Sequence, residues 1–422
     1  MSNRVPDDWT LSKVGELSQV KRGASPRPIQ DPKWWGGSVG WVRISDVTRS
    51  HKYLTKTTQY LSDEGVSKSV RVATGEVILS ICATIGRPII VGVDACIHDG
   101  FVWFDKLRNS INREYWYYFL SSKENYLSGQ RQSGTQGNLN TSIVAELECP
   151  LPPLPEQQKI AAILSSVDDV IEKTRAQIDK LKDLKSGMMQ ELLTKGVGSG
   201  GVPHTEFKDS PVGRIPACWE VHRADDISDA IMVGVVIKPT QYYVDQGVPA
   251  LRSANVRENG LTMDNLKYFS EESNDRLHKS KLSKGDLLTV RTGYPGTTAV
   301  VTKEFEGCNC IDVVITRPSA EMDSDFLCLW VNSNHGKGQV LKAQGGLAQQ
   351  HFNVGDMKNL LVPIPPLEEQ RGIFRAVESV IGKLSISEIR LAQFSSLKKA
   401  LMQDLLTGKV RVNVDQKESA VA

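Results

Sequence analysis

The sequence lacks long apolar runs, paired cysteines and a strong net charge. No stretch of its 422 residues approaches the roughly 18 consecutive apolar residues that a membrane-spanning helix needs. Residues 1–9 are polar and charged, without the apolar segment of a secretory signal, so we expect a cytoplasmic protein that does not enter a membrane. The seven cysteines are odd in number and scattered, which favours neither a disulfide framework nor a zinc site.

The sequence also lacks the usual motifs of enzymes that act on nucleotides or DNA. The Gly-Lys pairs at 336–337 and 408–409 have neither the upstream glycine nor the following Ser or Thr of a phosphate-binding loop. The Pro-Pro pairs at 152–153 and 365–366 lie between aliphatic residues and are not followed by the aromatic residue that a DNA methyltransferase uses on a flipped base. No S-adenosylmethionine loop or nuclease carboxylate cluster is evident. We expect no catalytic residue, no metal site and no cofactor in this chain.

The strongest positive signal is an internal repeat with a period of roughly 210 residues, too long for a solenoid unit. Its anchors occur in the same order in both copies: residues 6–9 and 216–219, 41–47 and 250–256, 75–80 and 285–290, and 150–158 and 363–371. The last pair, Pro-Leu-Pro-Pro-Leu-Pro-Glu-Gln-Gln against Pro-Ile-Pro-Pro-Leu-Glu-Glu-Gln-Arg, is the clearest. The chain therefore contains two copies of a whole domain and its connector.

A helical pattern follows each proline cluster. Apolar residues recur at alternating three- and four-residue steps from Ile160 to Leu192 and again from Ile373 to Leu405, as in a coiled-coil seam. Each helix would hold about 40 residues and extend about 60 Å. Two apolar stripes of matching length most simply bury each other, and we expect an antiparallel pair. The alternative is the core of an ordinary helical bundle.

We therefore predict an α+β protein with two pseudo-symmetric α/β domains, joined by two long helices paired as an antiparallel coiled coil. Short runs predict strands at 76–81, 88–93 and 286–290 and helices at 114–120 and 326–331. The expected bounds are 1–153 for the first domain, 154–196 for the central helix, 197–214 for a linker, 215–366 for the second domain, 367–408 for the C-terminal helix and 409–422 for a disordered tail.

The formal net charge is only +2, so nucleic-acid binding would have to depend on local patches. Basic, amide and aromatic residues gather in loop segments of both domains, where Arg, Gln and Asn could make paired contacts with base edges. For any single one of these residues a solvated turn is an equally good interpretation. The candidate DNA-contacting residues are Arg22, Arg27, Arg43, Arg131, Gln132, Thr135, Gln136 and Asn138 in the first copy, and Arg252, Asn255, Arg291, Thr292, Tyr294, Gln349 and Gln350 in the second.

Together these features resemble the specificity subunits of type I restriction-modification systems. The resemblance covers nearly the entire chain and rests on the Pro-Leu-Pro-Pro-Leu-x-Glu-Gln element at 150–157 and its partner at 363–370, on the Leu-Leu-Thr ends of both helices, and on residues 204–221. Ser133-Gly134-Thr135-Gln136-Gly137-Asn138 also looks like a segment of the family's target-recognition domains. The second copy departs there, with Gly345-Gly346-Leu347-Ala348-Gln349-Gln350.

The resemblance implies a non-catalytic subunit that binds double-stranded DNA through two target-recognition domains, one for each half of a bipartite target. It implies assembly with two methyltransferase subunits and up to two restriction subunits. S-adenosylmethionine, ATP and magnesium would belong to those partners. Three alternatives remain open from the sequence: the recognition part of a stand-alone restriction-methylation enzyme, a DNA-binding regulator, and a decoy subunit without active partners.

Overall fold

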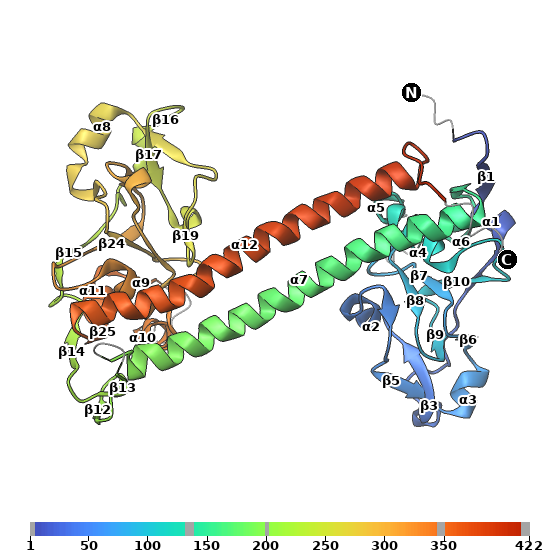
Figure 1. The fold of residues 1–422 in the computed structure, drawn as a ribbon, viewed down its shortest axis with the longest axis horizontal. Coiled ribbons are helices and arrows are strands. Elements are labelled where there is room, and N and C mark those ends of the chain that lie inside the picture. Colours follow the sequence, from blue (N-terminus) through green and yellow to red (C-terminus); the bar gives the residue numbers. More distant parts are fainter. Residues whose placement is uncertain (1–4, 131–138, 199–201, 344–350, 415–422) are drawn as a thin grey trace. The chain divides into compact units, whose positions relative to one another are not determined.

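The computed structural model describes residues 5–130, 139–198, 202–343 and 351–414, and its chain forms two compact units. Unit 1 comprises residues 1–175 and 390–422, and unit 2 comprises residues 176–389. Each unit thus combines one globular domain with one part of each long helix, α7 (Leu154–Lys195) and α12 (Leu367–Leu405) (Figure 1). Among the described residues, no helix is both long and apolar enough to cross a membrane.

The domain of unit 1 is built on two sheets. A five-stranded sheet has the order β2-β10-β7-β8-β4, a four-stranded sheet has the order β5-β3-β9-β6, and β1 pairs with β11. The strands are β1 Thr10–Lys13, β2 Gln19–Arg22, β3 Trp35–Val42, β4 Tyr53–Leu54, β5 Gln59–Leu61, β6 Val70–Val72, β7 Val77–Ser80, β8 Pro88–Val91, β9 Ala95–Ile97, β10 Phe101–Asp105 and β11 Glu148–Leu151. The helices are α1 Val14–Leu17, η1 Pro32–Trp34, α2 Ile44–Arg49, α3 Asp63–Ser67, α4 Arg113–Ser122, α5 Glu124–Gly129 and α6 Thr141–Ala145.

The domain of unit 2 repeats this plan with its own two main sheets. Their strand orders are β15-β24-β21-β22 and β16-β20-β17-β23, and the two-stranded pairs are β12-β13, β14-β25 and β18-β19. The strands are β12 Phe207–Ser210, β13 Gly213–Pro216, β14 Glu220–Arg223, β15 Ser228–Val233, β16 Tyr243–Val244, β17 Val248–Leu251, β18 Val256–Arg257, β19 Gly260–Leu261, β20 Lys267–Phe269, β21 Leu287–Val290, β22 Thr298–Val300, β23 Asn309–Cys310, β24 Val313–Pro318 and β25 Leu361–Ile364. The helices are η2 Pro239–Tyr242, η3 Ser253–Asn255, α8 Glu271–Arg276, η4 His278–Ser280, η5 Lys303–Phe305, α9 Ser324–Asn332, α10 Asn334–Ala343 and α11 Val354–Lys358.

The predicted strands and helices within the domains are confirmed. All four residues of β7, β8 and β21 are buried, which explains their continuous apolar sequence. Helix α4 packs on β7 and β8, and α9 packs on β22, and each helix has six buried residues. These apolar layers hold each sheet against its own helices.

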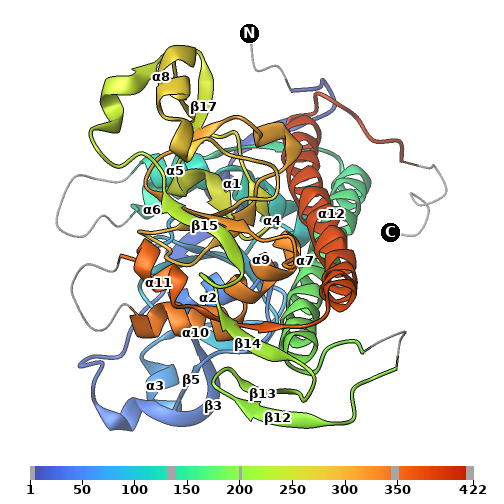
Figure 2. The same ribbon diagram turned by 90° about the vertical axis from the view of Figure 1, so that its left-hand side faces the viewer.

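The antiparallel pairing of the two long helices is confirmed (Figures 1 and 2). In unit 1 Lys398 of α12 lies 2.6 Å from Asp168 of α7, and in unit 2 Glu388 of α12 lies 3.9 Å from Lys182 of α7. Asp168 pairs with Lys398, and the later residue Lys182 pairs with the earlier residue Glu388. The two helices therefore run in opposite directions. The predicted seam positions Leu184 and Leu397 keep half of their surface exposed, because a pair of helices encloses only a narrow stripe of each.

The Glu-Gln pair at the start of each long helix ties that helix to its domain. Gln157 accepts a hydrogen bond from the backbone N–H of Asn112 at 2.8 Å, and Asn112 caps the N-terminus of α4. Gln370 accepts the N–H of Asp323 at 2.7 Å, and Asp323 caps α9 in the same way. The repeated motif therefore fixes the angle between a long helix and a domain helix twice.

The glutamates of these pairs hold the segments that follow the long helices. The buried Glu369 carboxylate accepts hydrogen bonds from the Trp219 indole at 3.0 Å and from the backbone N–H groups of Val197 and Gly198 at 3.0 and 2.8 Å. Within 197–214, expected to be a linker, residues 197 and 198 are thus fixed and the hairpin β12–β13 begins. The conformation of residues 197 and 198 is therefore fixed by their hydrogen bonds to Glu369, although the glycine content of the segment suggested a flexible linker.

The segment after α12 is also fixed where the structure describes it. Arg411 donates to Glu156 at 2.8 Å and to Asp8 at 2.8 and 2.6 Å, and the Trp9 indole donates to Glu156 at 3.1 Å. Residues 409–414, expected to begin a disordered tail, therefore contact the domain through a buried carboxylate. The polar composition of this segment does not predict that Arg411 binds Glu156.

Candidate nucleic-acid interface

The main sheet of each domain brings three loops to one edge. In unit 1, β10 pairs with β2 and β7 so that the loops after β2, after β7 and before β10 meet; we name residues 22–28, 81–87 and 98–100 the first loop edge. In unit 2, β24 pairs with β15 and β21 in the same way, and residues 234–238, 291–297 and 311–312 form the second loop edge. Loop residues positioned by a rigid sheet are a common arrangement for ligand recognition.

Arginines of the first loop edge surround one aspartate. Arg27 Nη2 lies 3.1 Å from Asp99 Oδ2, the Ser25 hydroxyl donates to Asp99 Oδ1 at 2.7 Å, and Arg22 Nε donates to the Asp99 backbone carbonyl at 2.5 Å. Arg43 follows β3, which pairs in parallel with β9, so that it stands in register beside residue 98. The sheet thus gathers three sequence-predicted residues, Arg22, Arg27 and Arg43, that are far apart in the sequence.

The second loop edge repeats this arrangement with different residues. Arg291 forms an ion pair with Asp312, and Arg252 stands in register beside residue 311 because β17 pairs in parallel with β23. Arg252 donates to the backbone carbonyl of Asn265 at 2.8 Å. Among the described residues, the buried Nε atoms of Arg291 and Arg252 have no hydrogen-bond partner. Such an unpaired donor costs about 1–3 kcal/mol, so stability alone does not account for these two arginines.

Exposed side chains also mark the second loop edge. Tyr294 keeps 85% of its surface exposed at the tip of the predicted Gly-Tyr-Pro-Gly turn, where Gly293 and Gly296 have positive φ angles of 88° and 85°. Ile237 is 75% exposed, Thr292 is half-buried, and the neighbouring Lys238 is exposed. This edge therefore offers apolar, aromatic and cationic surface together.

The predicted contact of Asn255 with DNA is contradicted by its position. Asn255 is fully buried, its side-chain oxygen accepts the N–H of Arg252 at 3.1 Å, and its Nδ2 donates to the carbonyls of Thr262 and Asp264 at 3.1 and 2.7 Å. Asp46 in the first domain is buried too and accepts the N–H of Arg43 at 3.0 Å. Both side chains shape the turn that presents an arginine, and neither is available to a ligand.

Seven of the sequence-predicted residues lie outside the described residues. They are Arg131, Gln132, Thr135, Gln136, Asn138, Gln349 and Gln350. The residues that follow these segments are described, and they bond to the loop edges: Leu139 donates its N–H to the carbonyl of Ile81 at 2.9 Å, and Phe352 donates to that of Arg291 at 2.9 Å. Leu139 and Phe352 are therefore anchored at the edges that carry the arginines.

Sequence reasoning missed Asp99, Asp312 and Lys238. An acidic residue is an unlikely choice when contacts with a polyanion are sought, and Lys238 stands alone in an apolar segment. A signal was nevertheless present, because Asp99 and Asp312 each follow a short buried strand, β9 or β23, at the same place in the repeat. Aligning the two copies strand by strand would have paired them.

The charges of the first loop edge favour an anionic or hydrogen-bonding ligand. Burial alone would raise the pKa of Asp99, but the hydrogen bond from Ser25 and the charge of Arg27 outweigh it and leave the pKa below its usual value. Burial lowers the pKa of His98, so this imidazole is neutral at pH 7. Arg22, Arg27 and the adjacent Arg43 outnumber Asp99, and this surplus of positive charge suits phosphates and the acceptor atoms of base edges.

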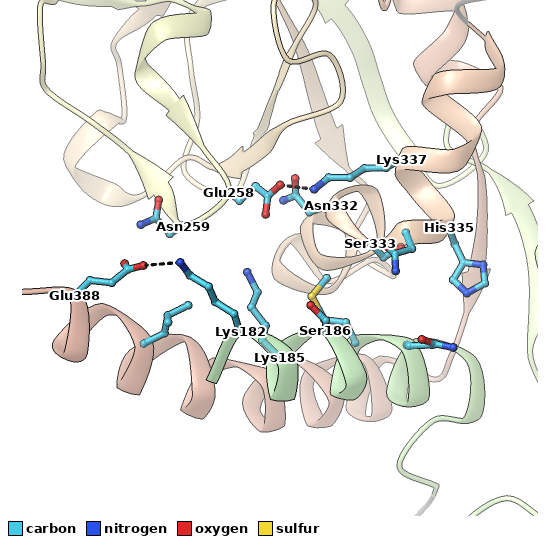
Figure 3. A pocket seen from close by; sticks show the side chains of 14 residues that line it. Lys182, Lys185, Ser186, Glu258, Asn259, Asn332, Ser333, His335, Lys337 and Glu388 are labelled. Carbon is cyan, nitrogen blue, oxygen red and sulfur yellow. Dashed lines mark hydrogen bonds and ion pairs between the residues drawn. The ribbon is translucent and has the colours of Figure 1, made fainter. Parts of the chain in front are cut away.

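Unit 2 also contains a polar cavity of about 690 Å³ (Figure 3). Its charged side chains largely pair with one another: Lys182 lies 3.9 Å from Glu388, and Lys337 forms an ion pair with Glu258. The cavity shows no nucleophile held by a base. Within the described parts of the chain, no group of three or more His, Cys, Asp and Glu side chains is placed to hold a metal ion.

Comparison with known proteins identifies the family. The family model described as "Type I restriction modification DNA specificity domain" matches residues 6–183 and 216–393. The MjaVIII type I restriction enzyme specificity subunit of Methanocaldococcus jannaschii is 27% identical, over 97% of this chain and 94% of that protein. The EcoBI specificity subunit of Escherichia coli is 21% identical, over 96% of this chain and 87% of that protein.

Solved structures share the fold. The S subunit of a type I restriction-modification system from M. genitalium superposes with a TM-score of 0.60 at 14% sequence identity, covering 96% of this chain and 97% of that one. The repeated family match agrees with the two loop edges, one in each copy. The resemblance predicted from the sequence is confirmed: the chain belongs to the family of type I restriction-modification DNA specificity subunits.

Proposed function

We propose that this chain reads a bipartite DNA sequence, one half-site through each loop edge. The single observation that carries the proposal is the repetition of an arginine-bearing sheet edge in the two domains of one chain. Arginine forks recognise base edges and phosphates, and each edge presents them on loops fixed by a sheet. The two edges differ in sequence, so the two half-sites would differ as well.

The paired helices would set the gap between the half-sites. Both α7 and α12 are continuous, and each contributes residues to both units. The helix pair would act as a stiff connector, and the two halves of a DNA-binding protein commonly meet half-sites about one turn, roughly 34 Å, apart. The gap length would then follow from the helix length rather than from base contacts.

The chain would act within a larger assembly. Two methyltransferase subunits would dock on it, and up to two restriction subunits would join that core. S-adenosylmethionine, ATP and magnesium would be held by those partners, and this chain would contribute recognition without chemistry. The assembly would work in the cytoplasm, where its double-stranded DNA target is found.

Mapping methylated adenines tests the proposed function. The chain is expressed with its neighbouring methyltransferase, and the genome is compared by single-molecule sequencing with that of cells lacking only this chain. We expect a split motif with a methylated adenine in each half. No difference, with an active partner demonstrably present, would refute the proposal and favour a decoy subunit, and failure of the two chains to co-purify would favour a regulator that binds DNA alone.

The helix lengths can be tested separately. Insertions near 188–194 would disrupt the second domain, because Met189 and Leu193 lie in its core. Seven-residue insertions after the exposed residues Asp179 and Arg390 would instead lengthen both helices while keeping their heptad register. We expect a longer gap between unchanged half-sites; a changed half-site with an unchanged gap would refute the role of the helices.

A further inference from the structure

The two missed aspartates, Asp99 and Asp312, occupy equivalent places in the two domains. Each lies two residues after a short buried strand of the second sheet, β9 or β23, and just before a main-sheet strand, β10 or β24. Each remains substantially exposed, with 42% of the Asp99 side chain and 46% of the Asp312 side chain accessible. A carboxylate at both of two surfaces that would meet a polyanion needs a reason, because it repels phosphates.

The reason is found in the partners of these carboxylates. Asp99 is bonded to Arg27, and Asp312 is bonded to Arg291. A carboxylate that accepts a hydrogen bond from one N–H of a guanidinium fixes the plane of that guanidinium and leaves its other N–H donors free to point at a ligand. In the first domain the Ser25 hydroxyl fixes Asp99 from the other side, at 2.7 Å.

Within the described part of the chain, other donors of these two arginines have no hydrogen-bond partner. Arg27 is 73% exposed and makes its single ion pair through Nη2, among the described residues. Arg291 is more enclosed, with 20% of its side chain exposed, and its buried Nε has no partner among the described residues. Each guanidinium is therefore held by a carboxylate through one terminal nitrogen, Nη2 of Arg27 and Nη1 of Arg291, at a sheet edge.

We propose that Arg27 and Arg291 each read a guanine, and that Asp99 and Asp312 are the positioning residues that orient their forks. Guanine presents two acceptors, O6 and N7, in the major groove, and a guanidinium held in one plane can donate to both. Cytosine and adenine each present an amino donor there, which repels the fork. The inference rests on the proposed function, because it presupposes that the two edges face DNA.

The test uses the full complex of this chain with its methyltransferase. Binding of the purified complex is measured in competition between the cognate duplex and duplexes with one base pair replaced at each position of each half-site. The single variants are Arg27→Lys and Asp99→Asn in the first domain, and Arg291→Lys and Asp312→Asn in the second. Lysine keeps the charge but loses the fork, and asparagine keeps the size but loses the charge that holds the arginine.

Matched controls alter ion pairs of the same kind away from the loop edges. Arg317→Lys removes a bidentate pair with Asp286, two contacts of 2.8 Å at the opposite end of β24 from Asp312. Asp94→Asn breaks the exposed pair with Arg71 in the first domain. These controls share any loss of stability with the test variants, but they should leave the preference at every base position unchanged.

We expect Arg27→Lys and Asp99→Asn to relax the same single G·C position of one half-site, and Arg291→Lys and Asp312→Asn to relax one G·C position of the other. Discrimination at that position should fall roughly 5- to 150-fold, the range for one paired base contact. Unchanged base preferences, a relaxed A·T position, or changes in both half-sites from one variant would overturn the assignment. If the wild-type complex directs no split motif at all, the proposed function fails instead, so the two failures are distinguishable.

Discussion

The buried carboxylate of Glu369 should be a main stabilising contact of unit 2, and its removal can be predicted in magnitude. The side chain is 3% exposed and accepts hydrogen bonds from the Trp219 indole, from the N–H groups of Val197 and Gly198, and from the ring of His204 at 2.8 Å. Substitution Glu369→Ala leaves all of these groups without their acceptor. No other residue of the described chain is bonded to the Trp219 indole.

The expected cost follows from the number of buried donors. Trp219 is fully buried and Gly198 is buried, so water replaces the lost acceptor poorly at these two positions. A buried donor left unpaired costs about 1–3 kcal/mol, and hydrogen bonds to a charged acceptor lie at the upper end. We add the costs of the two buried donors and a smaller cost at the half-buried Val197, whose N–H can turn toward water. Glu369→Ala should then lower the free energy of unfolding of unit 2 by about 3–5 kcal/mol.

The adjacent Glu368 supplies the control. Its side chain is 80% exposed, and its ion pair with Arg371 lies on the helix surface, so Glu368→Ala should cost less than about 1 kcal/mol. Urea unfolding followed by hydrogen exchange of peptides from 192–222 measures both variants in the same unit. Equal unfolding free energies for Glu369→Ala and Glu368→Ala would refute the stabilising role of the buried carboxylate.

Three further predictions concern unit 1 and the division of labour between the domains. Because burial lowers the pKa of His98, the unfolded chain binds a proton more readily than the folded chain, and the free energy of unfolding should fall as the pH drops below the usual histidine pKa of 6.5. The variant His98→Asn can still accept the Gly100 N–H but does not titrate, so urea titrations should show that this part of the pH dependence is lost. Arg411→Gln removes the charged partner that the structure gives to the buried Glu156, so the urea midpoint of unit 1 should fall; an unchanged midpoint would contradict the pairing. Exchanging residues 1–153 for those of another family member should change one half-site of the methylated motif, and a change in both would contradict independent domains.

The sequence predicted the architecture because the architecture depends on repetition and periodicity. The apolar steps from Ile160 to Leu192 indicate a helix whatever its partner, and the repeated Pro-Pro and Glu-Gln residues mark where each helix begins. Residues 197, 198 and 411 were harder to predict, because they are held by hydrogen bonds to Glu369 and Glu156, up to 172 and 255 positions away in the sequence. Composition carries no information about such a bond.

The candidate site was predicted in part for a related reason. We chose Arg22, Arg27 and Arg43 because they lie in predicted loops. The sheet register that brings them close to residues 98 and 99 could not be predicted, because it depends on which strands pair and not on the local sequence pattern. Asn255 was chosen for a side chain that can contact adenine, yet its amide closes a turn in the interior. The residue type indicates which groups a side chain could bind. Whether that side chain is exposed to DNA or bonded inside the protein depends on the fold, which the residue type does not show.

Comparison of the two copies separates the framework from the surface that would read DNA. The residues that repeat most closely, such as Glu156 with Glu369 and Gln157 with Gln370, are buried and bonded to fixed parts of their own units. At the loop edges the aspartate recurs, but its arginine comes from the loop after β2 in one domain and from the loop after β21 in the other. A fork that enters from a different strand end would meet a different base position. Two half-sites of unlike sequence therefore require only that these loops diverge, while the carboxylate that orients the fork keeps its place.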